Sequence, residues 1–331
     1  MENTTKIFVY SFREFDEAPF FEQYGREFGA ELKICREIPR MENLSLAEGY
    51  PYISILTNPI DRPMMERLAA QGVRMISTRT VGYDHVDLAA AKEFGVSVSN
   101  ASYPSESVAE YAVMMMLMAL RKMKRILERA SINDFSLPGN LGCPLRHRKV
   151  GILGTGRIGC EVAKILSGFG CEVLAYDLYQ KKGMEQYFRY VDLDTLLSSC
   201  DVISLHMPLD ESNFHMIDSG AIAKMPQGTV IVNTARGGLI DTKALIAGLE
   251  NGHLGGAALD VIEGEFDMYY FDRKSDVIDK HDLFILRGFP NVFITPHMAF
   301  YTDLTVRHMV KSSVESCVLT AQGKKNPWKV L

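Results

Sequence analysis

The 331-residue sequence lacks the features that mark several common classes of protein. Its six cysteines form no C-x-x-C pair, so they indicate neither a disulfide framework nor a zinc site, and no metal site is expected. The most membrane-like run, YAVMMMLMAL (111–120), is half of the roughly 20 apolar residues that a membrane span requires, so no membrane partner is expected. A net charge of −5, with no Lys/Arg block long enough to outweigh it, argues against binding to nucleic acid.

The amino-terminal residues MENTTKIFVYSF lead directly into a strand-like pattern, without the basic and apolar leader of a secreted protein. We therefore expect a cytoplasmic protein with reduced thiols. The chain contains no long repeat and no low-complexity tract, and its length favours two domains, since single hydrophobic cores stop growing at roughly 250–300 residues.

Short aliphatic runs alternate with helical patterns along the whole sequence. The expected strands are KIFVYSF, YISIL, RMIST, VSVSN, KVGILG, EVLAYD, DVISLHM, TVIVNTA, GGAALDV and NVFITPH. The expected helices are RPMMERLAAQG, VDLAAAKEFG, GCEVAKILSGFG, LDTLLSSC, SGAIAKM and DTKALIAGLENG, with longer ones over about 105–131 and 302–322. This alternation predicts an α/β fold with parallel sheets covered by helices on both faces.

A glycine-rich motif follows the fifth expected strand. Gly154, Gly156 and Gly159 have the spacing G-x-G-x-x-G between a strand and a helix, which predicts a dinucleotide site with the pyrophosphate at the helix N-terminus. Asp177 ends the next strand, 18 residues after Gly159, where an acid can bind the ribose 2′-hydroxyl and repel a 2′-phosphate. NAD is therefore the expected cofactor. The alternative is that the glycines serve packing and Asp177 belongs to a turn.

Three later strands deliver polar side chains to the same edge of the predicted sheet. Arg236 follows TVIVN, Asp260 and Glu265 follow GGAAL, and His297 follows NVFIT. Arg236 can hold a substrate carboxylate through two hydrogen bonds, and His297 can donate a proton to a carbonyl oxygen. Glu265 can orient the imidazole and favour its protonated form. The alternatives are a surface arginine in a salt bridge and a structural histidine, with seven other histidines competing for the role.

These motifs carry a resemblance that covers nearly the whole chain. GILGTGRIG, HMPL, NTARGGLID, GGAALDV and NVFITPH together resemble the D-isomer-specific 2-hydroxyacid dehydrogenase family, as do the spacings of 29 residues from Arg236 to Glu265 and 32 from Glu265 to His297. The sequences STRTVGYDHVD, ASYPSESVAEY and ITPHMAFYTD are closest in character to D-lactate dehydrogenases, including those of the glycopeptide-resistance type.

The resemblance implies a role for each matching residue. Arg236, Glu265 and His297 would be catalytic. Cofactor contacts are implied for Gly154, Gly156, Arg157, Ile158, Gly159, Asp177, Met207, Pro208, Asn213, Thr234, Ala235, Arg236 and Asp260, the last of these at the nicotinamide carboxamide. Substrate contacts are implied for Val81, Gly82, Tyr103, Arg236 and Phe300, with backbone N–H groups of the first two binding the carboxylate. Gly237 and Gly238 would let the backbone pass close to the cofactor.

The resemblance also implies a homodimer with two domains in each chain. A Rossmann-type doubly wound sheet would span 103–299, and a smaller flavodoxin-like α/β domain would combine 1–102 with 300–331. The expected reaction is reduction of a 2-keto acid to the D-2-hydroxy acid, with pyruvate first.

Two departures from the family pattern leave other substrates open. YPSES stands where Tyr-Ser-Pro is usual, and Leu56 and Thr57 replace a bulky aromatic, which suits 2-ketoisocaproate or phenylpyruvate. Glyoxylate, formate and 3-phosphoglycerate enzymes are the rivals within the family. An NAD(H)-sensing, corepressor-like binding protein is the alternative from another class.

Overall fold

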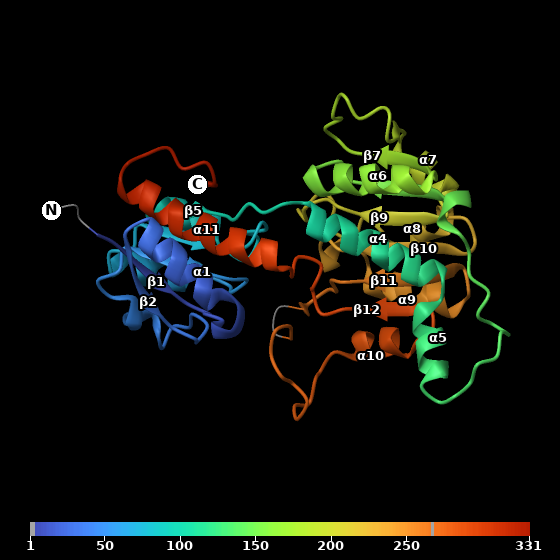
Figure 1. Ribbon diagram of the computed structural model, residues 1–331, viewed down its shortest axis with the longest axis horizontal. Helices are drawn as coiled ribbons and strands as arrows, with labels where there is room; N and C mark the ends of the chain where they lie inside the picture. Colours follow the sequence, from blue (N-terminus) through green and yellow to red (C-terminus); the bar gives the residue numbers. More distant parts are fainter. Residues whose placement is uncertain (1–3, 266–267) are drawn as a thin grey trace. The chain divides into compact units, whose positions relative to one another are not determined.

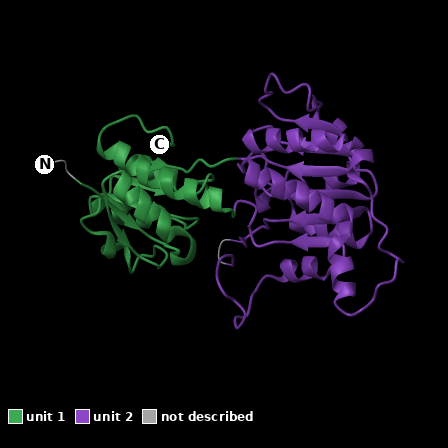
Figure 2. Cartoon of the chain, viewed as in Figure 1, with its two compact units in different colours: residues 1–104, 301–331 green, residues 105–300 purple. Residues whose placement is uncertain are grey.

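The computed structural model describes residues 4–265 and 268–331. The chain divides into two compact units, shown in different colours in Figure 2. The first unit combines residues 1–104 with 301–331, and the second comprises residues 105–300.

The first unit is built on a five-stranded parallel sheet of order β2-β1-β3-β4-β5. Its strands are β1 (Thr5–Val9), β2 (Ala30–Ile34), β3 (Tyr52–Ile55), β4 (Met75–Thr78) and β5 (Ser97–Ser99). Its helices are α1 (Glu14–Glu27), α2 (Arg62–Ala70), α3 (Leu88–Glu93), α11 (Asp303–Ala321) and a short 3-10 turn, η1 (Leu44–Ala47).

Successive residues of β1 point to opposite faces of this sheet, as the strand period of two requires. Ile7 packs in one cluster with residues of α1 and α11, and Phe8 packs in another with residues of α2 and α3. Helices from the two ends of the chain therefore cover the same face, and Figure 1 shows α1 and α11 side by side.

The second unit is built on a seven-stranded parallel sheet of order β12-β11-β10-β9-β6-β7-β8. Its strands are β6 (Lys149–Leu153), β7 (Glu172–Tyr176), β8 (Arg189–Tyr190), β9 (Val202–Leu205), β10 (Thr229–Asn233), β11 (Leu254–Leu259) and β12 (Val292–Ile294). The order reverses at β6, which is the doubly wound arrangement expected from the sequence.

Helices cover both faces of this second sheet. They are α4 (Glu106–Leu120), α5 (Met123–Ala130), α6 (Arg157–Phe169), α7 (Leu193–Ser199), α8 (Ser219–Lys224), α9 (Thr242–Glu250) and α10 (His281–Gly288), with 3-10 turns η2 (Leu145–His147) and η3 (Gly237–Leu239). The buried residues of α4 and α6 belong to one apolar cluster, whereas those of α7 to α10 belong to another.

The α/β fold predicted from the sequence is confirmed, and each of the ten expected strands is present. The sequence analysis missed the strands β2 and β8 and the helices α1 and α10. The two strands lie at sheet edges and are largely exposed, so they lack the apolar runs by which buried strands are recognised. Helix α1 contains Pro19, a residue that disfavours a helix interior.

The expectation of one long helix over about 105–131 is wrong. Helix α4 ends at Leu120, and Lys122 has a left-handed conformation with φ of 53° before α5 begins. The Leu120 carbonyl accepts a hydrogen bond of 2.9 Å from the Cys143 N–H, so a distant segment binds a carbonyl at the end of the helix. That contact is not local in sequence, and the helical pattern gave no sign of it.

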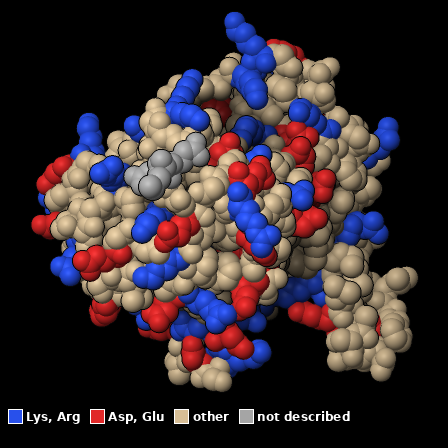
Figure 3. Space-filling model, turned by 60° about the vertical axis from the view of Figure 1, so that its left-hand side comes forward, with Lys and Arg blue, Asp and Glu red and all other residues tan. Residues whose placement is uncertain are grey.

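On the face drawn in Figure 3, basic and acidic side chains are interspersed rather than gathered into a patch of one sign. Within residues 4–265 and 268–331, no helix is both long enough and apolar enough to cross a membrane.

Candidate active site

The glycine-rich motif forms the turn between β6 and α6. Gly154 has φ of +95°, and a Cβ there would lie 2.8 Å from the backbone carbonyl carbon of His206. A Cβ on Gly159 would lie 2.0 Å from the Gly154 oxygen, so both positions require glycine for packing within the protein. Gly156 has no atom within 4 Å of its Cβ position, and it is the N-cap of the 13-residue helix α6. The turn therefore leaves backbone accessible at a helix N-terminus, which suits a pyrophosphate.

Asp177 follows β7 directly and lies beside this turn. One carboxylate oxygen accepts hydrogen bonds from the Thr155 N–H (2.6 Å) and the Thr155 hydroxyl (3.1 Å). The other accepts a bond of 2.8 Å from the Tyr179 N–H. The Tyr190 hydroxyl bonds Thr155 Oγ1 at 2.7 Å, which supports the same arrangement. The structure thus joins the two parts of the predicted dinucleotide motif through hydrogen bonds.

Two polar side chains at this sheet edge have buried atoms without a hydrogen-bond partner among the described residues. They are Thr234 Oγ1, after β10, and His206 Nδ1, after β9. Burial lowers the pKa of His206 to about 3, and its Nε2 bonds Ser204 Oγ at 2.8 Å, so the ring is neutral at pH 7. Buried polar atoms normally find partners, and these two fit a polar ligand such as a nicotinamide nucleotide.

Sequence reasoning did not assign His206 to the site and counted it among the competing histidines. Its position directly after a strand and before Met207 and Pro208 was the signal that could have identified it. Asn213, expected to line the cofactor cleft, binds its own loop: its side-chain amide donates to the Pro208 carbonyl at 2.7 Å and accepts from the Asp210 N–H at 2.8 Å.

Arg236 leaves β10 in extended conformation, and Asn233 holds the turn that carries it. The buried Asn233 side chain donates to the Arg236 carbonyl at 2.8 Å and accepts from the Ala235 N–H at 3.0 Å. The Arg236 guanidinium donates to the Ala235 carbonyl at 2.7 Å. Strands β10, β11 and β12 are parallel neighbours, so Arg236, Glu265 and His297 all follow strands that end at the same edge of the sheet.

The two glycines after Arg236 lie close to other parts of the protein. A Cβ on Gly237 would lie 2.1 Å from the backbone carbon of Ile262, and one on Gly238 would lie 2.9 Å from the Leu209 side chain. Gly237 is required because its turn passes close to the backbone after β11, whereas the end of the Leu209 side chain beside Gly238 could move aside. Close approach of this turn to a cofactor, the reason expected from the sequence, stays a prediction.

His297 and Glu265 form a direct hydrogen bond. The His297 Nδ1 and Glu265 Oε1 atoms are 2.6 Å apart, and the other oxygen of the buried Glu265 carboxylate accepts from the Ile262 N–H at 2.7 Å. His297 Nε2 has no partner among the described residues, and 23% of the side chain is exposed. An imidazole whose Nδ1 is held by a carboxylate is oriented to transfer a proton through Nε2.

Asp260 holds the segment that carries His297. Its fully buried carboxylate accepts hydrogen bonds from the Thr295 hydroxyl (2.5 Å), the Met298 N–H (2.8 Å) and the Ala299 N–H (2.8 Å). His297 has φ of 54°, a conformation that costs energy for a residue with a Cβ and needs support from its surroundings. Both oxygens of Asp260 are thus occupied within the protein, whereas the resemblance implies contact with the nicotinamide carboxamide.

Aromatic rings surround the His297 imidazole. The Phe300 ring lies edge-on at 6.2 Å, Tyr269 edge-on at 6.5 Å and Tyr270 tilted at 6.4 Å between centroids. The Tyr270 hydroxyl donates to the His297 carbonyl at 3.0 Å. Sequence reasoning predicted Phe300 but missed both tyrosines, although MYYF directly follows the segment of Glu265.

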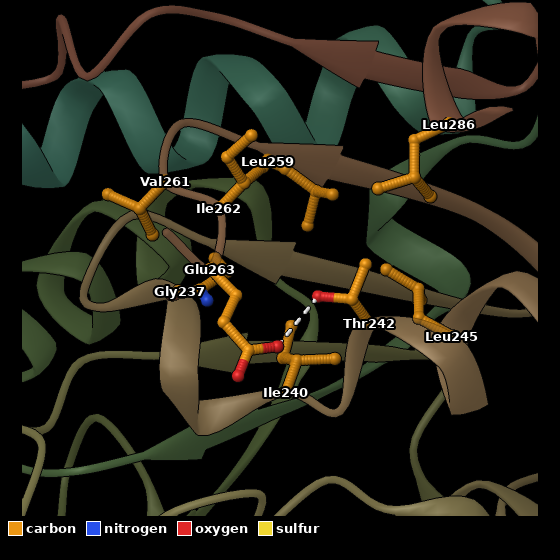
Figure 4. Close-up of a pocket in the computed structure, with 10 residues that line it drawn as sticks. Gly237, Ile240, Thr242, Leu245, Leu259, Val261, Ile262, Glu263 and Leu286 are labelled. Carbon is orange, nitrogen blue, oxygen red and sulfur yellow. Dashed lines mark hydrogen bonds between the residues drawn. The ribbon is translucent and has the colours of Figure 1, made fainter. Parts of the chain in front are cut away.

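A small cavity lies near this edge of the sheet but is not the reaction site. Figure 4 shows it between Gly237, Ile240 and Leu259, with Glu263 joined to the Thr242 hydroxyl. None of its lining residues is Arg236, Glu265 or His297. The remaining predicted substrate residues, Val81, Gly82 and Tyr103, belong to the first unit.

The chain is similar to proteins of a known family along most of its length. Residues 113–299 match the family described as D-isomer specific 2-hydroxyacid dehydrogenase, NAD binding domain. The chain is 39% identical over 309 residues to the aromatic 2-oxoacid reductase of Clostridium sporogenes. The aligned residues make up 92% of this chain and 93% of that protein.

Two solved structures show the same fold along nearly the whole chain. A D-lactate dehydrogenase from Treponema pallidum is 32% identical with a TM-score of 0.88, covering 98% of this chain and 99% of that one. A D-2-hydroxyisocaproate dehydrogenase is 34% identical with a TM-score of 0.87, again covering 98% and 99%. The chain therefore belongs to the D-isomer-specific 2-hydroxyacid dehydrogenase family and is an NAD-dependent oxidoreductase.

Proposed function

We propose that the protein reduces a 2-keto acid to the D-2-hydroxy acid with His297 as the acid. The observation that carries this proposal is the 2.6 Å contact between His297 Nδ1 and Glu265, with Nε2 lacking a protein partner among the described residues. The Glu265 carboxylate holds the imidazole through Nδ1, and in the protonated ring Nε2 donates its proton to the carbonyl oxygen of the substrate. When bound, the cofactor NADH would supply the hydride for the carbonyl carbon. The products are the hydroxy acid, neutral His297 and NAD.

Arg236 binds the substrate carboxylate in this proposal. A guanidinium presents two parallel N–H groups that match the two oxygens of a carboxylate. The turn braced by Asn233 presents it at the strand edge where Glu265 and His297 also lie. In the first unit, Val81 and Gly82 offer backbone N–H groups that suit a carboxylate, and Tyr103 is proposed to contact the substrate side chain. In the second unit, Phe300 is proposed for the same role as Tyr103. The first unit thus serves as the substrate domain.

In this proposal the pyrophosphate binds at the turn between β6 and α6, through Gly154, Gly156, Arg157, Ile158 and Gly159. Asp177 binds the adenosine ribose. The accessible backbone at Gly156 and the hydrogen bonds between Thr155 and Asp177 support this assignment. Further cofactor contacts come from Met207, Pro208, Asn213, Thr234 and Ala235.

Pyruvate, giving D-lactate, is the proposed substrate, and larger 2-keto acids are the second candidate. Resemblance to D-lactate dehydrogenases favours pyruvate. The rings of Phe300 and Tyr270 beside His297 favour a substrate with an apolar or aromatic side chain. A pocket that differs by one methylene discriminates by only ~1–3 kcal/mol, so several 2-keto acids can be turned over.

The test is the initial rate of NADH oxidation with pyruvate, 2-ketoisocaproate, phenylpyruvate and glyoxylate in parallel, repeated with NADPH. Turnover with pyruvate fastest supports the proposal in full. A preference for phenylpyruvate or 2-ketoisocaproate keeps the reaction and changes the substrate. NADH binding without turnover of any 2-keto acid would contradict the proposed enzyme activity and favour a cofactor-sensing protein.

We further propose that the protein forms a homodimer in the cytoplasm. An arm over residues 131–142 follows α5, and four of its apolar side chains are 74–86% exposed: Ile132, Phe135, Leu137 and Leu141. Arg129 holds the arm through Asp134, Ser136 and the Pro138 carbonyl, so these side chains are exposed on an ordered segment. An ordered apolar surface of this kind is typical of a protein interface.

A further inference from the structure

The turn after β4 has its carbonyl groups occupied. The Thr80 carbonyl accepts a hydrogen bond from the Ala101 N–H (2.8 Å), and the Val81 carbonyl accepts one from the Asn100 side-chain amide (2.7 Å). The Gly82 carbonyl accepts one from the Thr80 hydroxyl (2.6 Å). The N–H groups of Val81 and Gly82 have no acceptor among the described residues. The turn therefore presents donors without acceptors, an arrangement that suits an anion.

The bonds to the carbonyls determine where these N–H groups point. In a trans peptide the C=O and the N–H of the next residue point in opposite directions. The bond from Ala101 to the Thr80 carbonyl directs the Val81 N–H away from Ala101. In the same way, the bond from Asn100 to the Val81 carbonyl directs the Gly82 N–H away from Asn100. The first of these bonds comes from backbone, whereas the second depends on one side chain.

Asn100 is itself held firmly. It follows β5, the edge strand of the first sheet, and its N–H donates to the Trp328 carbonyl at 3.1 Å. The last residues of the chain pair with β5, since the Val330 N–H donates to the Val98 carbonyl at 2.8 Å and Ser99 bridges to Lys329. The backbone of Asn100 is therefore held by the bond to the Trp328 carbonyl, and the next residue, Ala101, is held by its bond to the Thr80 carbonyl. These two bonds keep the Asn100 side-chain amide at the turn.

We infer that Asn100 is a positioning residue for the substrate carboxylate, acting through the orientation of the Val81–Gly82 peptide. This inference rests on the proposed function, in which that peptide binds the carboxylate. Without the Asn100 amide, the peptide next to Gly82 can rotate, because glycine at one end restricts it little. Rotation would replace the Gly82 N–H by a carbonyl oxygen, which repels a carboxylate.

The experiment compares wild type with Asn100→Ala and Asn100→Asp. The first removes the donor, and the second keeps the size and planar shape while replacing the donor by an acceptor. We expect Asn100→Ala to raise the KM for the best 2-keto acid, and the Ki of oxamate, about three- to tenfold, the effect of one net hydrogen bond. We expect a larger rise for Asn100→Asp. In both variants kcat stays within about twofold and the Kd of NADH is unchanged, as loss of uniform substrate binding requires.

Asn43→Ala is the matched control. Asn43 is a buried asparagine of the same unit whose amide also donates to a backbone carbonyl, that of Ile38, at 2.8 Å. It should lower the melting temperature without changing KM. An unchanged KM and Ki in a folded Asn100→Ala or Asn100→Asp protein would overturn the inference, as would an equal rise in Asn43→Ala. Wild-type protein that reduces no 2-keto acid would overturn the proposed function, and this inference with it.

Discussion

At the scale of single residues, the proposal that His297 is the proton donor rests on its contact with Glu265. We expect His297→Gln to lower kcat/KM about 10²- to 10⁴-fold, because proton transfer by a positioned side chain contributes about that much. The Kd of NADH, measured by fluorescence titration, should stay the same.

His215→Gln provides the control for this substitution. His215 lies in the same unit, has φ of 53° and bonds a carboxylate, that of Glu263, at 2.9 Å. No role in the reaction is proposed for His215, so we expect His215→Gln to keep the wild-type kcat/KM. Retained pyruvate reduction in His297→Gln would remove His297 from the role of acid.

A second residue, Asp177, carries the proposed choice between NADH and NADPH. We expect Asp177→Ala to weaken NADH binding about tenfold, the scale of one hydrogen bond to a charged group, and to affect NADPH far less because repulsion of the 2′-phosphate is lost. The measurement is kcat/KM for both cofactors. Asp192→Ala removes a carboxylate of the same unit that caps α7, and it should leave the ratio unchanged. The same cofactor ratio in Asp177→Ala and wild type would refute the ribose role.

Sequence reasoning identified the candidate catalytic residues because they follow recognisable strands, whereas most other candidate contacts came from the resemblance to the family. Arg236 and His297 were found in this way. It named Thr234, but it could not show that the Thr234 hydroxyl is buried without a hydrogen-bond partner among the described residues. Nor could it show the hydrogen bonds of Asp260, since burial and bonds across 38 or 39 residues are not local properties. The position of Asp260 after its strand was predicted. That its carboxylate would hold the segment in which His297 adopts a left-handed conformation was not predicted.

At the scale of elements, the glycines in the turn between β6 and α6 and in the turn after β10 have different roles. We expect Gly237→Ala to lower the free energy of unfolding by about 1–3 kcal/mol, because its Cβ would collide with the Ile262 backbone, which cannot move aside like a side chain. Gly156→Ala should keep the wild-type melting temperature and lose NADH affinity, since the new methyl group would occupy open space at the helix N-terminus.

Thermal unfolding and NADH titration of both variants separate the two effects. Equal melting temperatures for Gly237→Ala and wild type would show that the Ile262 backbone can move to accommodate the new methyl group. Unaltered NADH affinity in Gly156→Ala would place the pyrophosphate elsewhere.

Element prediction succeeded where one face or both faces of an element are buried. Strands such as β9 and β10 are buried along their whole length and appear in the sequence as apolar runs. The strand β8 has two residues at the edge of the sheet and offers too short a pattern to detect. At the break between α4 and α5, the Leu120 carbonyl accepts a hydrogen bond from the Cys143 N–H, which lies 23 residues further along the chain. Contacts of that kind become visible only in the folded chain.

At the scale of the whole molecule, the arm after α5 carries the proposed dimer. We expect the double variant Phe135→Asp, Leu137→Asp to be a monomer by size-exclusion chromatography with light scattering, because two charges in an apolar interface cannot be solvated. Val277→Asp is the control: Val277 is 95% exposed in the same unit but lies outside the arm, and its variant should remain a dimer. A dimeric double variant would exclude the arm as the interface.

The pairing of the chain's last residues with β5 has a spectroscopic consequence. Trp328 is the single tryptophan of the sequence, and its carbonyl bonds the Asn100 N–H at the edge of the first sheet. Intrinsic tryptophan emission therefore reports on the first unit alone, whereas circular dichroism reports on the helices of both. A denaturation followed by the two signals in parallel would reveal whether the units melt together or in turn.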